Sequence, residues 1–190
     1  MPEAELRLTQ LLARAAAGDE DARHAALLAV HPRLQELAES QLRGDRRNAT
    51  LHATALVNEA YLRLFANPSD GWGSRGQFYA VAAKAMRHIV VDHARRKAAD
   101  KRGGRLAHVT LDAVASDAPL DASALLDLDN ALAGLAEISP RQAQLVEMRF
   151  FAGLSVEDAA RAMNISERSA QLDWRTARAW LRARLEGGAL

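Results

Sequence analysis

The stretch SVEDAARAMNISERSAQLDWRTARAWLRARL, residues 155–185, decides the fold of this chain. It predicts a short helix over Val156–Met163, a tight turn at 164–166 and a longer helix after the turn, which is the spacing of a helix-turn-helix unit. The small side chain of Ala160 allows the two helices to approach each other closely. Asn164 can adopt the left-handed backbone that such a turn needs.

The longer helix has two contrasting faces. Apolar residues recur at intervals of three and four and predict its buried stripe: Ala170, Trp174, Ala177, Leu181 and Leu185. The other side carries the candidate DNA-contacting residues: Arg168, Ser169, Gln171, Leu172, Arg175 and Arg178. Arginine can bind guanine, glutamine can pair with adenine, and leucine can touch a thymine methyl group. Any of the arginines could instead hold a phosphate.

A charged helix face is, by itself, typical of an ordinary solvated helical hairpin. Here the turn chemistry, the small residue at the crossing and a local basic excess occur together. Residues 141–186 hold eight arginines against six acidic residues, a net charge of +2. The combination indicates DNA binding by the end of the chain.

Charge is distributed unevenly along the chain, although 25 basic and 24 acidic residues nearly cancel over its 190 positions. Residues 84–105 contain eight basic and two acidic residues, a net charge of +6. Residues 106–127 contain four aspartates and no lysine or arginine. Two basic zones therefore flank an acidic one, a pattern that suits two DNA-facing modules joined by a linker that does not bind polyanions.

The fold is expected to be all-α, because alanine and leucine dominate and no segment alternates as a strand would. Cap and stop signals predict helices over residues 3–17, 53–66, 75–100, 125–137, 140–152, 156–163 and 167–186, and a further one that begins after Asp19. Pro32 should kink or break that further helix. Side-chain capping is expected at Ser74, Ser139, Ser155 and Ser166.

The basic helix at 75–100 is a second candidate for nucleic-acid contact. Its apolar side is predicted to be Phe78, Ala82, Ala85, Met86, Ile89 and Val90, and its polar side holds Lys84, Arg87, His88, Arg95 and Arg96. Trp72 and the first aromatic residues of the helix stand beside this positive charge, an arrangement that suits a strand-separated duplex. Two interpretations remain open at this point, because such aromatic residues are equally expected in a core with a merely solvated charged face.

Several classes of function find no support in the sequence. Cysteine is missing, so disulfides and thiolate metal sites are excluded. A metal site at His88, Asp92 and His93 is disfavoured by the cationic surroundings and the lack of another strong ligand. Nucleophile and phosphate-loop motifs are missing. We therefore expect no enzyme, no cofactor and no metal, and, without a signal peptide or an apolar span, a cytoplasmic protein with no membrane partner.

Three segments in order resemble a known family. ALVNEAYLRLF (55–65) resembles the polymerase-binding helix of sigma factor region 2, and FYAVAAKAMRHIVVDHARRKAADKRGG (78–104) looks like the adjoining helix that reads and melts the −10 element. Residues 139–185 resemble sigma region 4, which holds the −35 element. Their order and the chain length are similar to the extracytoplasmic-function (ECF) sigma factors of the sigma-70 superfamily.

This resemblance implies two small helical domains joined by a flexible acidic linker. Residues 1–105 would be the region 2 bundle, 106–127 the linker and 128–186 the region 4 helix-turn-helix domain. The implied partners are promoter DNA and core RNA polymerase, through its clamp helices and its flap. An anti-sigma factor or a regulatory kinase would be a further partner, which the sequence leaves open.

The resemblance also implies roles for individual residues. Asn58, Glu59 and Arg63 would face the polymerase clamp helices. Trp72, Lys84, Arg87, His88, Arg95 and Arg96 would face the −10 region, and the polar face of the last helix would face the −35 major groove. The chain departs from the family pattern at Gln171, where a basic residue is common, at Ala170, where valine is common, and at Asn164, where glycine is common.

Two other classes of protein compete with the sigma factor. One is a one-component helix-turn-helix regulator whose residues 1–105 sense a ligand. Against it, the positive charge of the long helix has no evident use in a sensor domain. The other is a helical adaptor or small helical enzyme in which the helix-turn-helix is incidental. Operator binding without polymerase would favour the first, and failure to bind either DNA or polymerase would favour the second.

Overall fold

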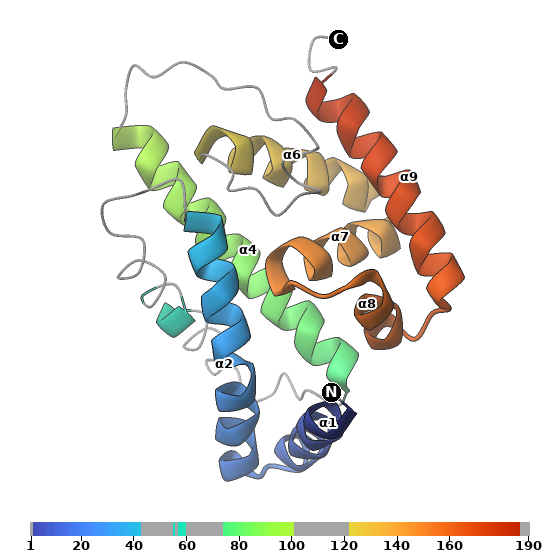
Figure 1. Ribbon diagram of the computed structural model, residues 1–190. Helices are drawn as coiled ribbons and strands as arrows, with labels where there is room; N and C mark the ends of the chain where they lie inside the picture. The colour runs from blue at the N-terminus through green and yellow to red at the C-terminus, as the bar shows by residue number, and fades with distance from the viewer. Residues whose placement is uncertain (1, 43–54, 56, 60–73, 101–121, 187–190) are drawn as a thin grey trace.

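The computed structural model describes residues 2–42, 55, 57–59, 74–100 and 122–186. All regular secondary structure within these residues is α-helical (Figure 1). The helices are α1 (Pro2–Ala16), α2 (Glu20–Leu42), α4 (Arg75–Asp100), α6 (Ala122–Ile138), α7 (Pro140–Ala152), α8 (Val156–Met163) and α9 (Glu167–Glu186). The all-α fold expected from the sequence is confirmed. Most of the predicted helix at 53–66 and the acidic stretch 106–121 lie outside the described residues.

Side-chain caps fix where four of these helices begin. The carboxylate of Asp19 accepts a hydrogen bond from the Ala22 N–H at 2.9 Å, and the Ser155 hydroxyl accepts one from the Asp158 N–H at 2.9 Å. Ser74 and Ser166 cap α4 and α9 in the same way, with distances of 3.2 and 3.1 Å. Each cap satisfies one backbone donor that the helix itself leaves unpaired.

Two sequence predictions about helix ends are wrong, and one about the interior of α2 is wrong in part. The side chain of Ser139 makes no capping hydrogen bond, although α7 begins as predicted with Pro140, whose fixed φ suits the first helical position. Of the two outcomes expected at Pro32, a kink or a break, the break does not occur, because α2 runs through it from Glu20 to Leu42. Helix α6 begins at Ala122, three residues before the predicted start at 125, and Ala124 and Leu125 in its first turn already bury apolar surface in the core.

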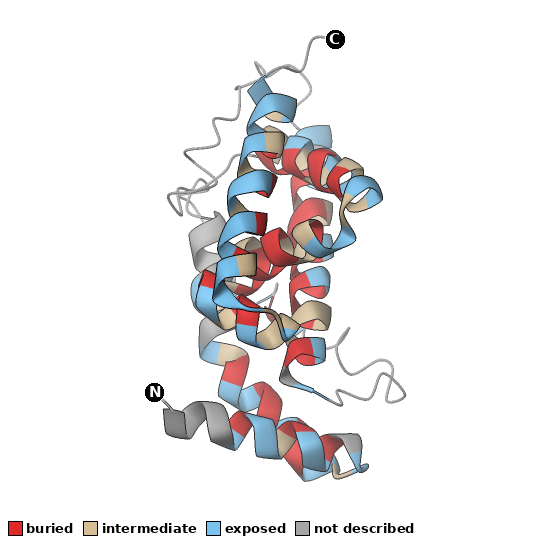
Figure 2. Ribbon diagram, turned by 90° about the vertical axis from the view of Figure 1, so that its right-hand side faces the viewer, coloured by how far each residue is buried: buried red, intermediate tan, exposed pale blue. Residues whose placement is uncertain are grey.

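Helix α4 lies between the N-terminal helices and the C-terminal helices and contacts both groups (Figure 1). Its predicted apolar side is buried throughout, and its main partners among the described residues are α6 and α7. Buried residues of α1, α2, α4, α6 and α7 belong to one hydrophobic cluster, which includes Phe78, Leu132 and Phe151. The buried surfaces of the helices face one another along this shared core (Figure 2).

The start of α4 approaches the backbone of α8 very closely. A Cβ atom added to Gly76 would lie 1.7 Å from the carbonyl oxygen of Ala162, a separation that no real side chain tolerates. Glycine is therefore required at this position for the helices to meet as they do.

Among the described residues, no helix is both long enough and apolar enough to cross a membrane.

Candidate nucleic-acid interface

The turn between α8 and α9 has the backbone geometry that the sequence predicts. Asn164 has φ 54° and ψ 44°, and its N–H donates to the carbonyl groups that end α8. The N–H of Ile165 then donates to the Ala160 carbonyl at 3.0 Å. Val156, Ala160 and Ala170 form a small separate core with Ile165 and Trp174 packed against it, which fixes the angle between the two helices.

One side of α9 is open to solvent. Arg168, Gln171, Leu172 and Arg175 are exposed, and 55% of the surface of Leu172 is accessible. A single exposed leucine is common on protein surfaces, so what matters here is that Leu172 shares its side of α9 with Arg168 and Arg175. Ser169 and Arg178, the other two predicted contact residues, are partly buried at the edges of this face.

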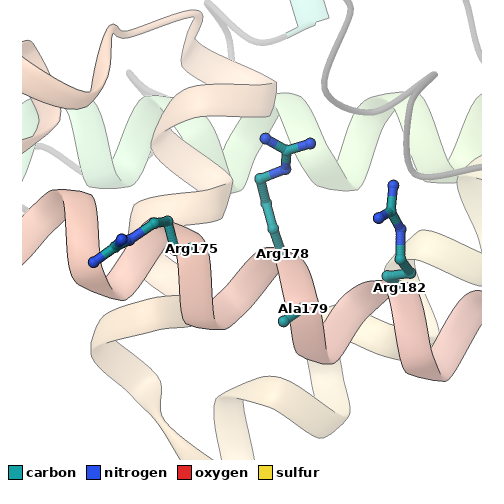
Figure 3. Close-up of a pocket in the computed structure, with 4 residues that line it drawn as sticks. All are labelled: Arg175, Arg178, Ala179 and Arg182. Carbon is teal, nitrogen blue, oxygen red and sulfur yellow. The ribbon is translucent and has the colours of Figure 1, made fainter.

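Arginines continue along α9 beyond the predicted set. Arg175, Arg178 and Arg182 line a shallow depression together with Ala179 (Figure 3). Arg178 and Arg182 project to the same side of the helix (Figure 3). Sequence reasoning missed Arg182, although its spacing of four from Arg178 was the signal that could have found it.

The amide of Gln171 is held by the preceding helix. Its Nε2 donates to Glu157 Oε1 at 3.3 Å. The pKa of Glu157 lies below its ordinary value, mainly because its own backbone N–H binds the carboxylate and secondarily because the Ser155 hydroxyl does. Glu157 therefore stays an acceptor for Gln171 at neutral pH.

A buried carboxylate on α9 was not anticipated. Asp173 is only 4% exposed and contacts Arg141 in the first turn of α7. On the other edge of the helix, the ring of Trp174 lies 4.5 Å from the guanidinium carbon of Arg149, at the far end of α7. The apolar stripe predicted for α9 is confirmed, with Ala170, Ala177 and Leu181 buried and Trp174 and Leu185 partly buried.

On α4, the structure separates the predicted −10 residues into two groups. Lys84 and His88 are exposed, as are Arg95 and Arg96. Arg95 binds Asp129 on α6 at 3.2 Å, and Arg96 donates to the Asp92 carbonyl at 3.3 Å. These four side chains remain accessible to a partner.

The expectation that Arg87 lies on the open polar side of α4 is wrong in this structure. Its side chain is 13% exposed and is shared between Asp129 on α6 and Glu147 on α7. Arg87 Nε donates to Asp129 Oδ1 at 2.8 Å, and Nη2 donates to the Asp129 carbonyl at 2.9 Å. The sequence pattern misplaced Arg87 because helical periodicity within α4 cannot reveal which outside helix supplies a carboxylate.

The predicted polymerase-binding residues lie only partly within the described residues. Asn58 is exposed and Glu59 partly exposed on a short helical segment, and Val57 beside them is buried. Arg63 and the −10 candidate Trp72 fall outside the described residues. Within the described part of the chain, no three His, Asp or Glu side chains come together as a metal site would require.

These features define a helical DNA-binding protein with a C-terminal helix-turn-helix unit. The family model of the ECF sigma factors matches residues 5–187. A similar relative is "ECF RNA polymerase sigma factor SigF" of Caulobacter vibrioides, which is 33% identical over 172 residues covering 90% of each chain. No solved structure matches the chain.

The chain belongs to the ECF sigma factor family. It is accordingly a transcription initiation factor, which binds core RNA polymerase and directs it to specific promoters.

Proposed function

We propose that the exposed side of α9 reads the −35 promoter element in the major groove. The observation that supports this most directly is the position of Arg168, Leu172 and Arg175, which are all exposed on one side of the second helix of a helix-turn-helix unit. In such units the second helix enters the major groove. Ser169, Gln171 and Arg178 complete the contact surface, and Arg182 extends it toward the phosphate backbone.

The −10 element contacts α4 in this proposal. Lys84, His88, Arg95 and Arg96 are exposed and provide a basic surface on one helix. Arg87 reaches DNA only after it has left Asp129 and Glu147, so its contact requires α4 to separate locally from α6 and α7. Trp72 lies near the extruded base.

Core polymerase binds both parts of the chain. Asn58, Glu59 and Arg63 face the clamp helices, within residues 1–105, and residues 128–186 engage the flap. The acidic stretch between them carries no positive charge that would compete for DNA. The protein acts by binding and needs no catalytic residue or cofactor.

Run-off transcription with purified core polymerase and a promoter library tests this function. We expect protein-dependent start sites that share two spaced upstream elements. Operator binding by the isolated chain, without stimulation of polymerase, would instead support a one-component regulator.

Replacing Arg175 with alanine tests the assignment of α9. If Arg175 binds a base, the variant should lose about 1–3 kcal/mol of binding and relax specificity at one promoter position. If Arg175 only holds a phosphate, binding to all sequences should weaken alike. Arg184→Ala is the matched control, because Arg184 is exposed on the opposite side of the same helix, about two and a half turns further on. An effect of Arg184→Ala equal to that of Arg175→Ala would contradict the assignment.

A further inference from the structure

We propose that the Arg141–Asp173 ion pair is a positioning contact that sets the rotation of α9 about its own axis, and so determines how well the −35 element is discriminated. This inference rests on the proposed role of α9. Neither residue belongs to the DNA-contacting set, and Asp173 stands on the recognition helix as a buried carboxylate.

The fully buried part of the apolar side of α9 contains few large side chains. Two of its three fully buried positions are alanines, Ala170 and Ala177, both with no exposed surface. A methyl group makes few contacts compared with a leucine or valine side chain, and close packing is what normally fixes the orientation of a helix. Leu181 is the one large apolar side chain of α9 that is fully buried, and it lies in the C-terminal half of the helix. Trp174, Trp180 and Leu185 are only partly buried and pack against the core from its margin.

Polar contacts to Asp173 restrain the orientation of α9, which the small alanine side chains restrain little. Arg141 Nη2 donates to Asp173 Oδ1 at 3.0 Å, and Arg141 Nε lies 2.8 Å from Oδ2, a close ionic contact rather than an aligned hydrogen bond. Gln142 Nε2 also approaches Oδ1, at 3.4 Å. The hydrogen bond and the ionic contact link both carboxylate oxygens of Asp173 to one guanidinium group, which limits how far this side chain can turn.

The contact acts together with a second one on the opposite edge of α9. Asp173 and Trp174 are consecutive residues, so their side chains leave the helix about 100° apart and flank the buried stripe. Asp173 is bound at the first turn of α7, and Trp174 packs under Arg149 near the end of α7. Attachment at both edges, to opposite ends of one supporting helix, opposes rotation in either direction.

The rotation of α9 affects DNA recognition because the proposed DNA-contacting residues occupy a narrow strip of the helix surface. Arg168, Leu172 and Arg175 project from a single side of α9. Base contacts require donor and acceptor atoms to match within the geometry of a hydrogen bond, whereas phosphate contacts tolerate more displacement. Loss of the rotational restraint should therefore reduce discrimination between sequences more than it reduces binding to any DNA.

Three variants of the full chain, assembled with core polymerase, test this proposal: Asp173→Ala, Arg141→Ala and the double variant. Arg141→Ala leaves Asp173 buried without its cation and should destabilise the fold most. Asp173→Ala leaves Arg141, whose side chain is 58% exposed, in contact with water. The double variant leaves no unpaired buried charge, so its melting temperature should lie near that of the parent.

The readout is the ratio of open-complex formation on two DNA fragments. One is a promoter selected from a randomised library with the parent protein, and the other is the same fragment with its upstream element scrambled. We expect the ratio to fall about fivefold or more in Asp173→Ala and in the double variant, the lower end of what one bidentate base contact contributes. If the double variant regains the melting temperature of the parent but not its open-complex ratio, the ion pair positions α9 and does not merely stabilise the fold.

Arg175→Ala and Arg184→Ala are run in parallel. If Arg175→Ala lowers the ratio and the double variant keeps the parent's ratio, the ion pair only stabilises the fold and the positioning proposal is overturned. If no α9 variant, Arg175→Ala included, changes the ratio, α9 does not read the upstream element, and the proposed function fails together with the inference drawn from it.

Discussion

Asn164 occupies a backbone conformation that few side chains accept. With φ 54° and ψ 44° it ends α8 and allows the chain to turn directly into the recognition helix. Asparagine is tolerated there because its short polar side chain can hydrogen-bond to the nearby backbone, which offsets part of the Cβ clash. The tight turn between α8 and α9 therefore depends on the backbone conformation at this position.

Replacement of Asn164 by glycine and by valine should change stability in opposite directions. Asn164→Gly removes the Cβ clash and should leave the melting temperature unchanged or raised. Asn164→Val should lose about 1–2 kcal/mol, the cost of left-handed backbone for an ordinary side chain. Thermal unfolding followed by circular dichroism measures both effects.

Asn130 provides the matched control. It is exposed within α6, in ordinary helical backbone, so Asn130→Gly should lower the melting temperature as glycine does in helix interiors. If glycine changed the melting temperature equally at positions 130 and 164, the left-handed backbone at the turn would not explain the effect of Asn164→Gly.

Among the helices, α7 and α8 begin by different means, although serine precedes both. Ser155 caps α8 with its hydroxyl group, whereas Ser139 makes no side-chain cap and α7 relies on Pro140. The sequence predicts a cap at both positions, because the side-chain types match and the torsion angles are not visible in it. Ser139 has φ −148° and ψ 89°, compared with φ −67° and ψ 166° at Ser155.

Substitution of the two serines should separate these mechanisms. Ser155→Ala should cost about 1 kcal/mol of unfolding free energy, because the Asp158 N–H loses its acceptor. Ser139→Ala should change stability little, since no capping bond is lost. Urea denaturation of both variants measures the difference, and a loss at Ser139 as large as that at Ser155 would refute it.

The sequence predicts helices well and contacts between helices poorly. The buried sides of α4 and α9 follow from periodicity alone, because each depends on residues three and four apart in one element. The exposed recognition residues follow from the same periodicity. The positions of Arg87 and Asp173 do not, because each depends on a partner 32 or more residues away. Such pairs are set by how helices pack, which a local pattern does not encode.

Across the whole molecule, α4 joins the proposed −10 surface to the helix-turn-helix unit through one core. Arg87 bonds to carboxylates on α6 and α7, and Gly76 lies against the backbone of α8. Arg87 would otherwise be an exposed cation available to DNA. In this arrangement its positive charge is neutralised by the C-terminal half of the chain.

A shared core predicts that the described helices unfold together. Thermal unfolding of the parent should show a single transition, because small cooperative units melt as one.

Gly76→Ala forces α4 and α8 apart and should lower the midpoint, with a cost of about 1–3 kcal/mol as for other overpacked contacts. Gly18→Ala is unsuitable as a control because Gly18 has φ 91°. Lys84→Ala, at an exposed position of α4, should leave the midpoint nearly unchanged. Two separate transitions in the parent, with Gly76→Ala shifting neither, would mean that the halves of the chain fold independently and that their contact through α4 contributes little to stability.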